Sequence, residues 1–183
     1  WSRPESEVKA LMELLERFLG KYTKDLLKNE IRLRIIGDIS VLPDKARAKV
    51  LEAIDQTKHL TKHTLVLALN YGGRQEVMRA AKLFAQDVNH DPSTADKLDW
   101  DSFKQYLYTQ DIPDPEMLIR TSGEMRTSNF LPLQCAYSEL VFSPLYWPEF
   151  DKDAFRDAIR QYRTRERRFG LTGEQLKEEV AAQ

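Results

Sequence analysis

Short aliphatic runs alternate with helical patterns along this chain, and this alternation restricts the possible folds more than any other feature. The runs that are typical of strands cover residues 31–36, 64–70, 116–121 and 138–143. Apolar residues with helical spacing cover residues 4–28, 43–60, 75–88, 99–110 and 151–170. Because strands separated by helices are joined by crossovers, they pair in parallel. The sequence therefore predicts an α/β fold, with a mostly parallel central sheet flanked by helices.

The composition is typical of one soluble globular domain. The chain has 183 residues, of which 42% are hydrophobic and 31% are charged. It contains no repeat, low-complexity segment or linker that would divide it. A chain of this length buries roughly 70% of the surface that its unfolded form exposes. We therefore expect residues 1–183 to form a single domain.

Charge, hydropathy and cysteine content exclude several classes of protein. The net charge is −1, which argues against a dedicated nucleic-acid-binding protein because such proteins carry a basic excess. No apolar stretch has the roughly eighteen residues that a membrane span needs, and no signal peptide is visible. Cys135 is the sole cysteine, so no disulfide can form within the chain. A reducing cytoplasm is the expected location.

The segment "LIRTSGEMRTSNF" (118–130) places two arginines, several hydroxyl groups and a glycine where the third expected strand ends. Ligands of parallel α/β sheets gather outside the carboxyl ends of the strands. Arg120 and Arg126 could bind phosphate oxygens there, with hydroxyl and backbone N–H groups beside them. The same residues are also compatible with a solvated loop, in which the arginines pair with Glu124 or Asp114.

Glu139 stands at the start of the fourth expected strand, close in sequence to the arginines. Magnesium needs only one or two protein carboxylates when it also binds substrate oxygens, so Glu139 could hold Mg²⁺ beside a diphosphate. An ordinary glutamate at a strand edge is the commoner alternative. The nucleotide-binding motifs G-x-x-x-x-G-K-[ST] and G-x-G-x-x-G do not occur. An anion bound here would therefore not be held by a standard nucleotide loop.

Other residues with reactive or metal-binding side chains are interpreted as structural. His59 and His63 have a spacing that can bind a metal, but no carboxylate or cysteine lies near them in the sequence, so we expect exposed side chains. Cys135 is expected to be a small buried thiol. "NYGGR" (70–74) is expected to form a tight turn from strand to helix. The arginines of the final helix (151–170) are expected to face solvent.

Taken together, these segments resemble the cis-prenyltransferases, and among them the bacterial undecaprenyl diphosphate synthases (isoprenyl transferases). The resemblance rests on "LIRTSGEMRTSNFLPLQCAYSELVFSPLYWPEFD" (118–151), "NYGGR" (70–74), "RRFG" (167–170) and the opening "WSRPESEV" (1–8). These motifs occur in the family's order over nearly the whole chain. The resemblance implies a magnesium-dependent transferase that adds isopentenyl diphosphate units to farnesyl diphosphate, forming cis double bonds. The product would be undecaprenyl diphosphate, the lipid carrier of cell-wall synthesis.

The resemblance also implies roles for particular residues. The residues implied to bind substrate are Arg120, Arg126, Ser128, Trp1 and Arg3. The first three match residues that hold the diphosphate of isopentenyl diphosphate, and the last two match a stretch beside the active site. Glu139 matches a carboxylate that helps to coordinate Mg²⁺.

The resemblance further implies a hydrophobic tunnel for the growing chain, lined by the first helix and its neighbour. Leu11, Leu15 and Ile35 are the candidate lining residues. Members of the family are usually homodimers. A cytoplasmic enzyme, peripheral to the membrane that receives its product, is therefore implied, with no nucleic-acid partner.

The family's amino-terminal "MDGNGRWA" segment, with an aspartate central to Mg²⁺ binding and catalysis, is not among the 183 residues. Trp1 is not a natural translation start, so we expect a truncated chain that lacks its first strand and its catalytic aspartate loop. Such a chain would contain no catalytic residue of its own and would be poorly active alone. Leu133, where relatives usually have tryptophan, and Met125, where some have histidine, are lesser departures.

A catalytically silent partner subunit of a cis-prenyltransferase complex is the alternative, since some eukaryotic relatives have that role. The matched set of Arg120, Arg126, Ser128 and Glu139 speaks against this alternative. Trans-prenyltransferases are excluded more firmly, because they are all-helical and need D-D-x-x-D motifs, whereas no Asp-Asp pair occurs in this sequence.

Overall fold

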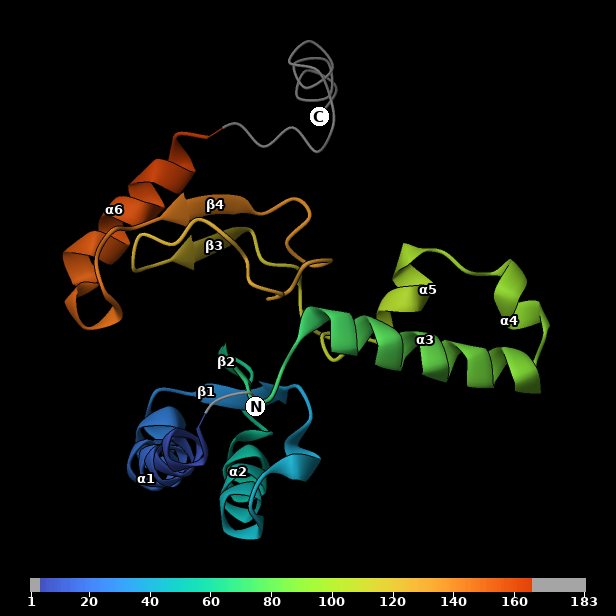
Figure 1. Ribbon diagram of the computed structural model, residues 1–183, viewed down its shortest axis with the longest axis horizontal. Coiled ribbons are helices and arrows are strands. Elements are labelled where there is room, and N and C mark those ends of the chain that lie inside the picture. The colour runs from blue at the N-terminus through green and yellow to red at the C-terminus, as the bar shows by residue number, and fades with distance from the viewer. Residues whose placement is uncertain (1–3, 166–183) are drawn as a thin grey trace. The chain divides into compact units, whose positions relative to one another are not determined.

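The computed structural model describes residues 4–165 and divides the chain into two compact units, Trp1–Asp111 and Ile112–Gln183. Each unit combines helices with one pair of parallel strands (Figure 1). The α/β class and the parallel strands that the sequence predicts are therefore confirmed. That residues 1–183 form one cis-prenyltransferase-like domain without its first strand stays a prediction.

The first unit contains a parallel strand pair and the longest helices of the described residues. Its elements are α1 (Glu5–Lys28), β1 (Ile31–Ile36), η1 (Ile39–Val41), α2 (Asp44–Thr57), β2 (His63–Ala68), α3 (Gly73–His90), α4 (Ser93–Asp96) and α5 (Trp100–Lys104). The register of β1 and β2 runs from Ile31 opposite His63 to Ile36 opposite Ala68. Helices α1 and α2 lie side by side against this pair (Figure 1).

The core of the first unit lies between α1, α2 and the strands. Leu19 of α1, Val50 of α2 and Leu33 of β1 are buried there together. Thr57 fixes the end of α2 to β1, because its Oγ1 accepts from the N–H of Leu33 at 3.0 Å and donates to the carbonyl of Ala53 at 2.8 Å. Apolar residues at helical and strand spacing thus produce a packed layer of helices on one face of the pair.

The second unit contains β3 (Met117–Arg120), β4 (Glu139–Phe142), η2 (Trp147–Glu149) and α6 (Lys152–Arg163). The register of β3 and β4 runs from Met117 opposite Glu139 to Arg120 opposite Phe142. Helix α6 packs along β4 (Figure 1). The carboxylate of Asp151 caps this helix by accepting from the N–H groups of Asp153 and Ala154. Residues 121–138 connect the strands through a series of turns.

The differences from the predicted elements have local causes. The strand predicted at 31–36 has the predicted bounds. The helix predicted over 99–110 ends at Lys104, where the N–H groups of the next three residues donate to carbonyls three residues back instead of four, and the N–H of Tyr108 then donates to the carboxylate of Glu76. Helix α4 lies between the helices predicted at 75–88 and 99–110, where the sequence analysis predicts no element. None of the helices described is long and apolar enough to cross a lipid bilayer.

Candidate functional site

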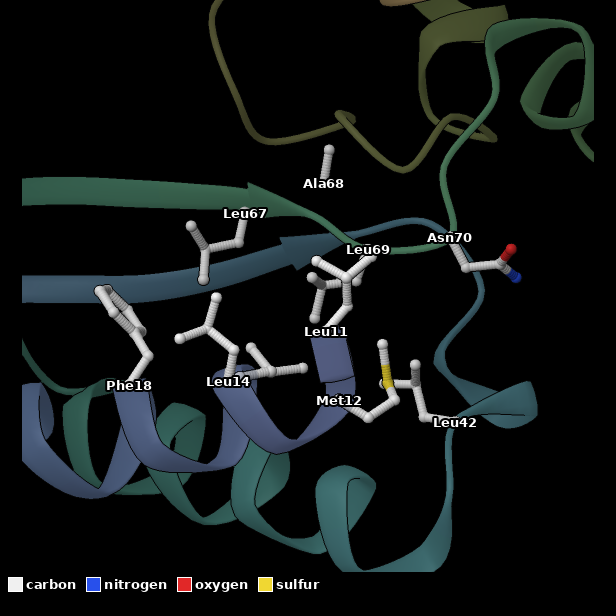
Figure 2. Close-up of a pocket in the computed structure, with 10 residues that line it drawn as sticks. Leu11, Met12, Leu14, Phe18, Leu42, Leu67, Ala68, Leu69 and Asn70 are labelled. Atoms are coloured by element: carbon white, nitrogen blue, oxygen red, sulfur yellow. The ribbon is translucent and has the colours of Figure 1, made fainter. Parts of the chain in front are cut away.

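An apolar pocket of about 420 Å³ lies in the first unit, between α1 and the carboxyl end of β2 (Figure 2). Its lining residues are Leu11, Met12, Leu14, Leu15, Phe18, Leu42, Leu67, Ala68, Leu69 and Asn70. Figure 2 shows the side chains of α1 directed toward those of Leu67 and Leu69. Leu11 and Leu14 are 42% and 55% exposed, so the pocket is open to solvent along α1. Only Asn70 adds a polar side chain, and such a lining suits a hydrocarbon chain.

Two of the three candidate tunnel residues line this pocket. Leu11 and Leu15 belong to the lining. Ile35 instead packs against the core cluster of the first unit. The sequence analysis did not name the β2 side of the pocket, although the alternating Leu65, Leu67 and Leu69 carry the signal of a strand face.

The turns that follow β1 and β2 meet at the rim of the pocket. Gly37 has a φ of +103°, and a Cβ atom there would lie 2.1 Å from the carbonyl oxygen of Leu69, so only glycine permits this approach. Nδ2 of Asn70 donates to the carbonyl of Asp38 at 3.0 Å. The hydroxyl and the N–H of Ser40 both donate to the Asp38 carboxylate, and these bonds hold the pKa of Asp38 below its usual range. Hydrogen bonds and one obligatory glycine therefore fix the rim.

Arg120, Arg126 and Ser128 come together at the carboxyl end of β3 in the second unit. Nη1 of Arg120 donates to the carbonyl of Arg126 at 2.7 Å and to Oγ of Ser128 at 3.0 Å. The guanidinium is thus anchored through one nitrogen, and its other nitrogens can bind a ligand. Because Oγ of Ser128 accepts from Arg120, its hydroxyl hydrogen can donate to an anion. We call residues 120–128, which carry these side chains, the arginine loop.

Arg126 forms an ion pair with Glu124. This pair is the one that the solvated-loop interpretation predicts for Arg126. An anion would compete with Glu124 for the same guanidinium, which is 64% exposed. The geometry is compatible with both interpretations of the arginine loop.

The arginine loop keeps its shape through left-handed backbone conformations. Ser122, Gly123 and Ser128 have φ values of +67°, +67° and +48°. The N–H groups of Ser122 and Gly123 donate to the carbonyls of Leu145 and Ser143 at 2.7 and 2.9 Å. These two N–H groups are therefore used within the fold. Donors to an anion at this turn would come from side chains rather than from the backbone of the glycine turn that the sequence suggests.

Glu139 lies away from the arginine loop. The register pairs it with Met117, whereas Arg120 is paired with Phe142. Three residues of strand, roughly 10 Å, therefore separate the level of Glu139 from that of Arg120. The carboxylate of Glu139 accepts from Nη1 of Arg165 at 2.9 Å. The structure brings three predicted residues together and leaves Glu139 at the opposite end of the strand pair.

Residues 4–165 contain no group of three or more His, Cys, Asp and Glu side chains that could hold a metal ion. A single carboxylate such as Glu139 suits Mg²⁺ only where substrate oxygens and water complete the coordination. The fit therefore requires a diphosphate and water at the metal, together with the carboxylate of Glu139, one oxygen of which pairs with Arg165.

The remaining predicted residues lie as follows. His59 and His63 are exposed, as expected. Cys135 is half-buried rather than fully buried, and desolvation raises the pKa of its thiol. Trp1 and Arg3, which the resemblance implies in substrate binding, lie outside the described residues, as does "RRFG".

Comparison with known proteins identifies one family. A sequence model described as "Putative undecaprenyl diphosphate synthase" matches residues 1–170. The ditrans,polycis-undecaprenyl-diphosphate synthase ((2E,6E)-farnesyl-diphosphate specific) of Micrococcus luteus is 46% identical over 170 residues, which cover 93% of this chain and 68% of the relative.

Two solved structures are also similar. A lavandulyl diphosphate synthase from Lavandula x intermedia, solved with dimethylallyl diphosphate, has a TM-score of 0.88 at 35% identity and covers 92% of this chain and 73% of its own. A "probable undecaprenyl diphosphate synthase" from Campylobacter jejuni has a TM-score of 0.78 at 37% identity, covering 93% of this chain and 77% of its own.

Proposed function

The chain belongs to the undecaprenyl diphosphate synthase family of cis-prenyltransferases, and on that premise we propose that it adds isopentenyl diphosphate units to farnesyl diphosphate to make undecaprenyl diphosphate. The observation that carries the proposal is the arginine loop, in which Arg120, Arg126 and Ser128 gather at a strand end. The apolar pocket of the first unit supports it, because an isoprenoid chain needs an apolar lining.

The arginine loop binds the diphosphate of isopentenyl diphosphate in this proposal. During the reaction the allylic C–O bond of farnesyl diphosphate breaks, and the diphosphate leaves with the electron pair. The isopentenyl double bond attacks the resulting cationic carbon, and a proton is then lost. Arg120 and Arg126 hold one anion in position for this attack. Positioning of this kind lowers the activation free energy by ~7–11 kcal/mol in favourable cases. Leu11 and its neighbours hold the apolar chain.

Mg²⁺ is the proposed cofactor, and Glu139 is its proposed ligand in this chain. When bound, the metal would stabilise negative charge on diphosphate oxygens. Glu139 supplies one carboxylate, in keeping with the preference of Mg²⁺ for substrate oxygens and water. Arg165 donates to one oxygen of that carboxylate, so the metal would bind the other oxygen or displace Arg165.

The proposed assembly is a cytoplasmic homodimer that is peripheral to the membrane and passes its product to it. Farnesyl diphosphate and isopentenyl diphosphate are its proposed partners, and no nucleic acid is involved. Trp1 and Arg3 complete the proposed substrate-binding set.

The proposal is tested by incorporation of labelled isopentenyl diphosphate onto farnesyl diphosphate with Mg²⁺. Residues 1–183 are compared with a version extended upstream by the protein's natural sequence. We expect long polyprenyl diphosphate from the extended version and little from residues 1–183. An extended version that is folded but makes no product would contradict the proposal, and it would favour the silent partner subunit instead.

A further inference from the structure

We propose that Glu76 is a positioning residue, which holds the rim of the apolar pocket in place for substrate. The inference rests on the proposed function and adds a residue to which the resemblance gives no role. Glu76 lies in the first turn of α3, and only 1% of its surface is exposed. A carboxylate this buried is costly to desolvate unless hydrogen bonds satisfy it, so its partners indicate what it does.

Both carboxylate oxygens of Glu76 bind donors from other segments. Oε2 accepts from the hydroxyl of Tyr71 at 2.6 Å, and Oε1 accepts from the backbone N–H of Tyr108 at 2.8 Å. Tyr71 belongs to the turn between β2 and α3, whereas Tyr108 belongs to the segment after α5. One side chain therefore joins two loops that are 37 residues apart in the chain to the start of a helix.

The Tyr71 turn borders the apolar pocket directly. Its preceding residue, Asn70, lines the pocket and donates to the carbonyl of Asp38 at 3.0 Å. Asn70 also has a φ of +47°, a left-handed conformation that needs support from its surroundings. Glu76 supplies such support one residue away, through the hydroxyl of Tyr71. Displacement of this turn would change the shape of the pocket at its one polar lining residue.

Arg79 makes a second set of contacts that hold the segment containing Tyr108. The guanidinium of Arg79, one turn after Glu76 in α3, lies 4.5 Å from the centre of the Tyr108 ring. Nη1 of Arg79 also donates to the carbonyl of Tyr106 at 3.0 Å. Glu76 and Arg79 thus fix the same segment from the same helix. The first turn of α3 acts as the anchor for both loops.

The substitution Glu76→Gln tests this role. Glutamine keeps the size of the side chain and one carbonyl acceptor, but its NH₂ group cannot accept from the second donor. We expect hydrogen exchange of the backbone in residues 69–73 and 106–109 to be about tenfold faster in the natural full-length protein. We also expect the KM for farnesyl diphosphate to rise about tenfold, with a smaller change in kcat, as expected for misplacement of a binding loop.

Tyr71→Phe is the second variant, because it removes a single hydroxyl and is the safer one for folding. It should show the same pattern at 69–73 to a smaller extent. Tyr106→Phe is the matched control, since its hydroxyl also donates to a carboxylate, that of Asp87 at 2.8 Å, but at an exposed site. This control should leave both exchange at 69–73 and the KM values unchanged.

The outcomes separate the role of Glu76 from the proposed function. Unchanged exchange at 69–73 in both Glu76→Gln and Tyr71→Phe would overturn the inference. Faster exchange with unchanged KM values in an active enzyme would also overturn it, because the loops would then have no effect on substrate. If the natural protein made no product, the proposed function would fail, and the exchange measurement alone would decide whether Glu76 holds the rim.

Discussion

The apolar pocket and the arginine loop are built by different means. The pocket of the first unit is lined by side chains of α1 and β2 that continue the core of that unit. The arginine loop of the second unit is made of turns, which left-handed residues and individual hydrogen bonds hold in shape. Hydrophobic periodicity therefore accounts for the α1 and β2 walls of the pocket, although its rim also needs Gly37 and hydrogen bonds. A polar site instead depends on particular residues at particular turns.

The largest expected effect concerns the dependence of the pocket on the core. Leu33 is 1% exposed in the core cluster of the first unit, so Leu33→Ala should lower the free energy of unfolding by about 3 kcal/mol. The measurement is urea denaturation. Leu51→Ala is the control, since Leu51 is 50% exposed on α2 and its truncation should change stability by less than ~0.5 kcal/mol. Equal losses of stability in the two variants would contradict the role of Leu33 in the core.

The second effect concerns the arginine loop, in which a single side chain should matter for turnover rather than for folding. Arg120→Ala should lower kcat/KM about 100-fold, or about 2.7 kcal/mol, because charge-assisted bonds to a diphosphate are lost. Steady-state assay with labelled isopentenyl diphosphate measures the change. Arg156→Ala removes a guanidinium that pairs with Asp153 on α6, and it should leave kcat/KM unchanged. A similar loss in Arg156→Ala would show a general charge effect instead.

The third effect distinguishes the two sites by the substrate that each is proposed to bind. Leu11→Ala removes apolar contact from the pocket and should raise the KM for farnesyl diphosphate about fivefold, or ~1 kcal/mol. The KM for isopentenyl diphosphate should stay the same. Leu98→Ala truncates a leucine that is similarly exposed, at 48%, but lies outside the pocket lining. A rise in KM with Leu98→Ala as well would mean that the pocket does not bind the farnesyl chain.

The smallest effect concerns the contribution of backbone conformation, rather than of side-chain contacts, to the free energy of unfolding. Gly20 lies inside α1, and a Cβ atom there would meet nothing within 4 Å. Gly20→Ala should therefore raise the free energy of unfolding by ~0.5–1 kcal/mol, as alanine favours helix. Gly37→Ala should do the reverse, because its Cβ would meet the Leu69 carbonyl oxygen. Thermal denaturation of both variants decides the sign, and a destabilising Gly20→Ala would contradict the open space beside α1.

Sequence pattern could predict the elements because short-range periodicity determines them. The strand at 31–36 and the long helix α1 follow from the spacing of apolar residues alone. The path of the chain after α5 could not be predicted in this way, since it involves a bond between Tyr108 and Glu76, 32 residues apart. Glu76 itself gave no signal, because a glutamate in the first turn of a helix is usually exposed.

Some features of the candidate site could likewise be predicted from the sequence, and others could not. The clustering of Arg120 with Ser128 follows from their place at a strand end, which the resemblance reinforced. The use of the Ser122 N–H by Leu145 could not be foreseen, because it depends on a left-handed serine and on a segment some twenty residues later. The distance of Glu139 from the arginines depends on strand register, which the sequence does not state.

The central claim is that the two sites bind different parts of the substrates, the pocket the farnesyl chain and the arginine loop the isopentenyl diphosphate. The most direct test is the dissociation constant of farnesyl diphosphate, measured by calorimetry without isopentenyl diphosphate, for the natural protein, Leu11→Ala and Arg120→Ala. We expect the dissociation constant of farnesyl diphosphate to rise about fivefold for Leu11→Ala and to stay unchanged for Arg120→Ala. Loss of farnesyl diphosphate binding in Arg120→Ala, with none in Leu11→Ala, would contradict the central claim.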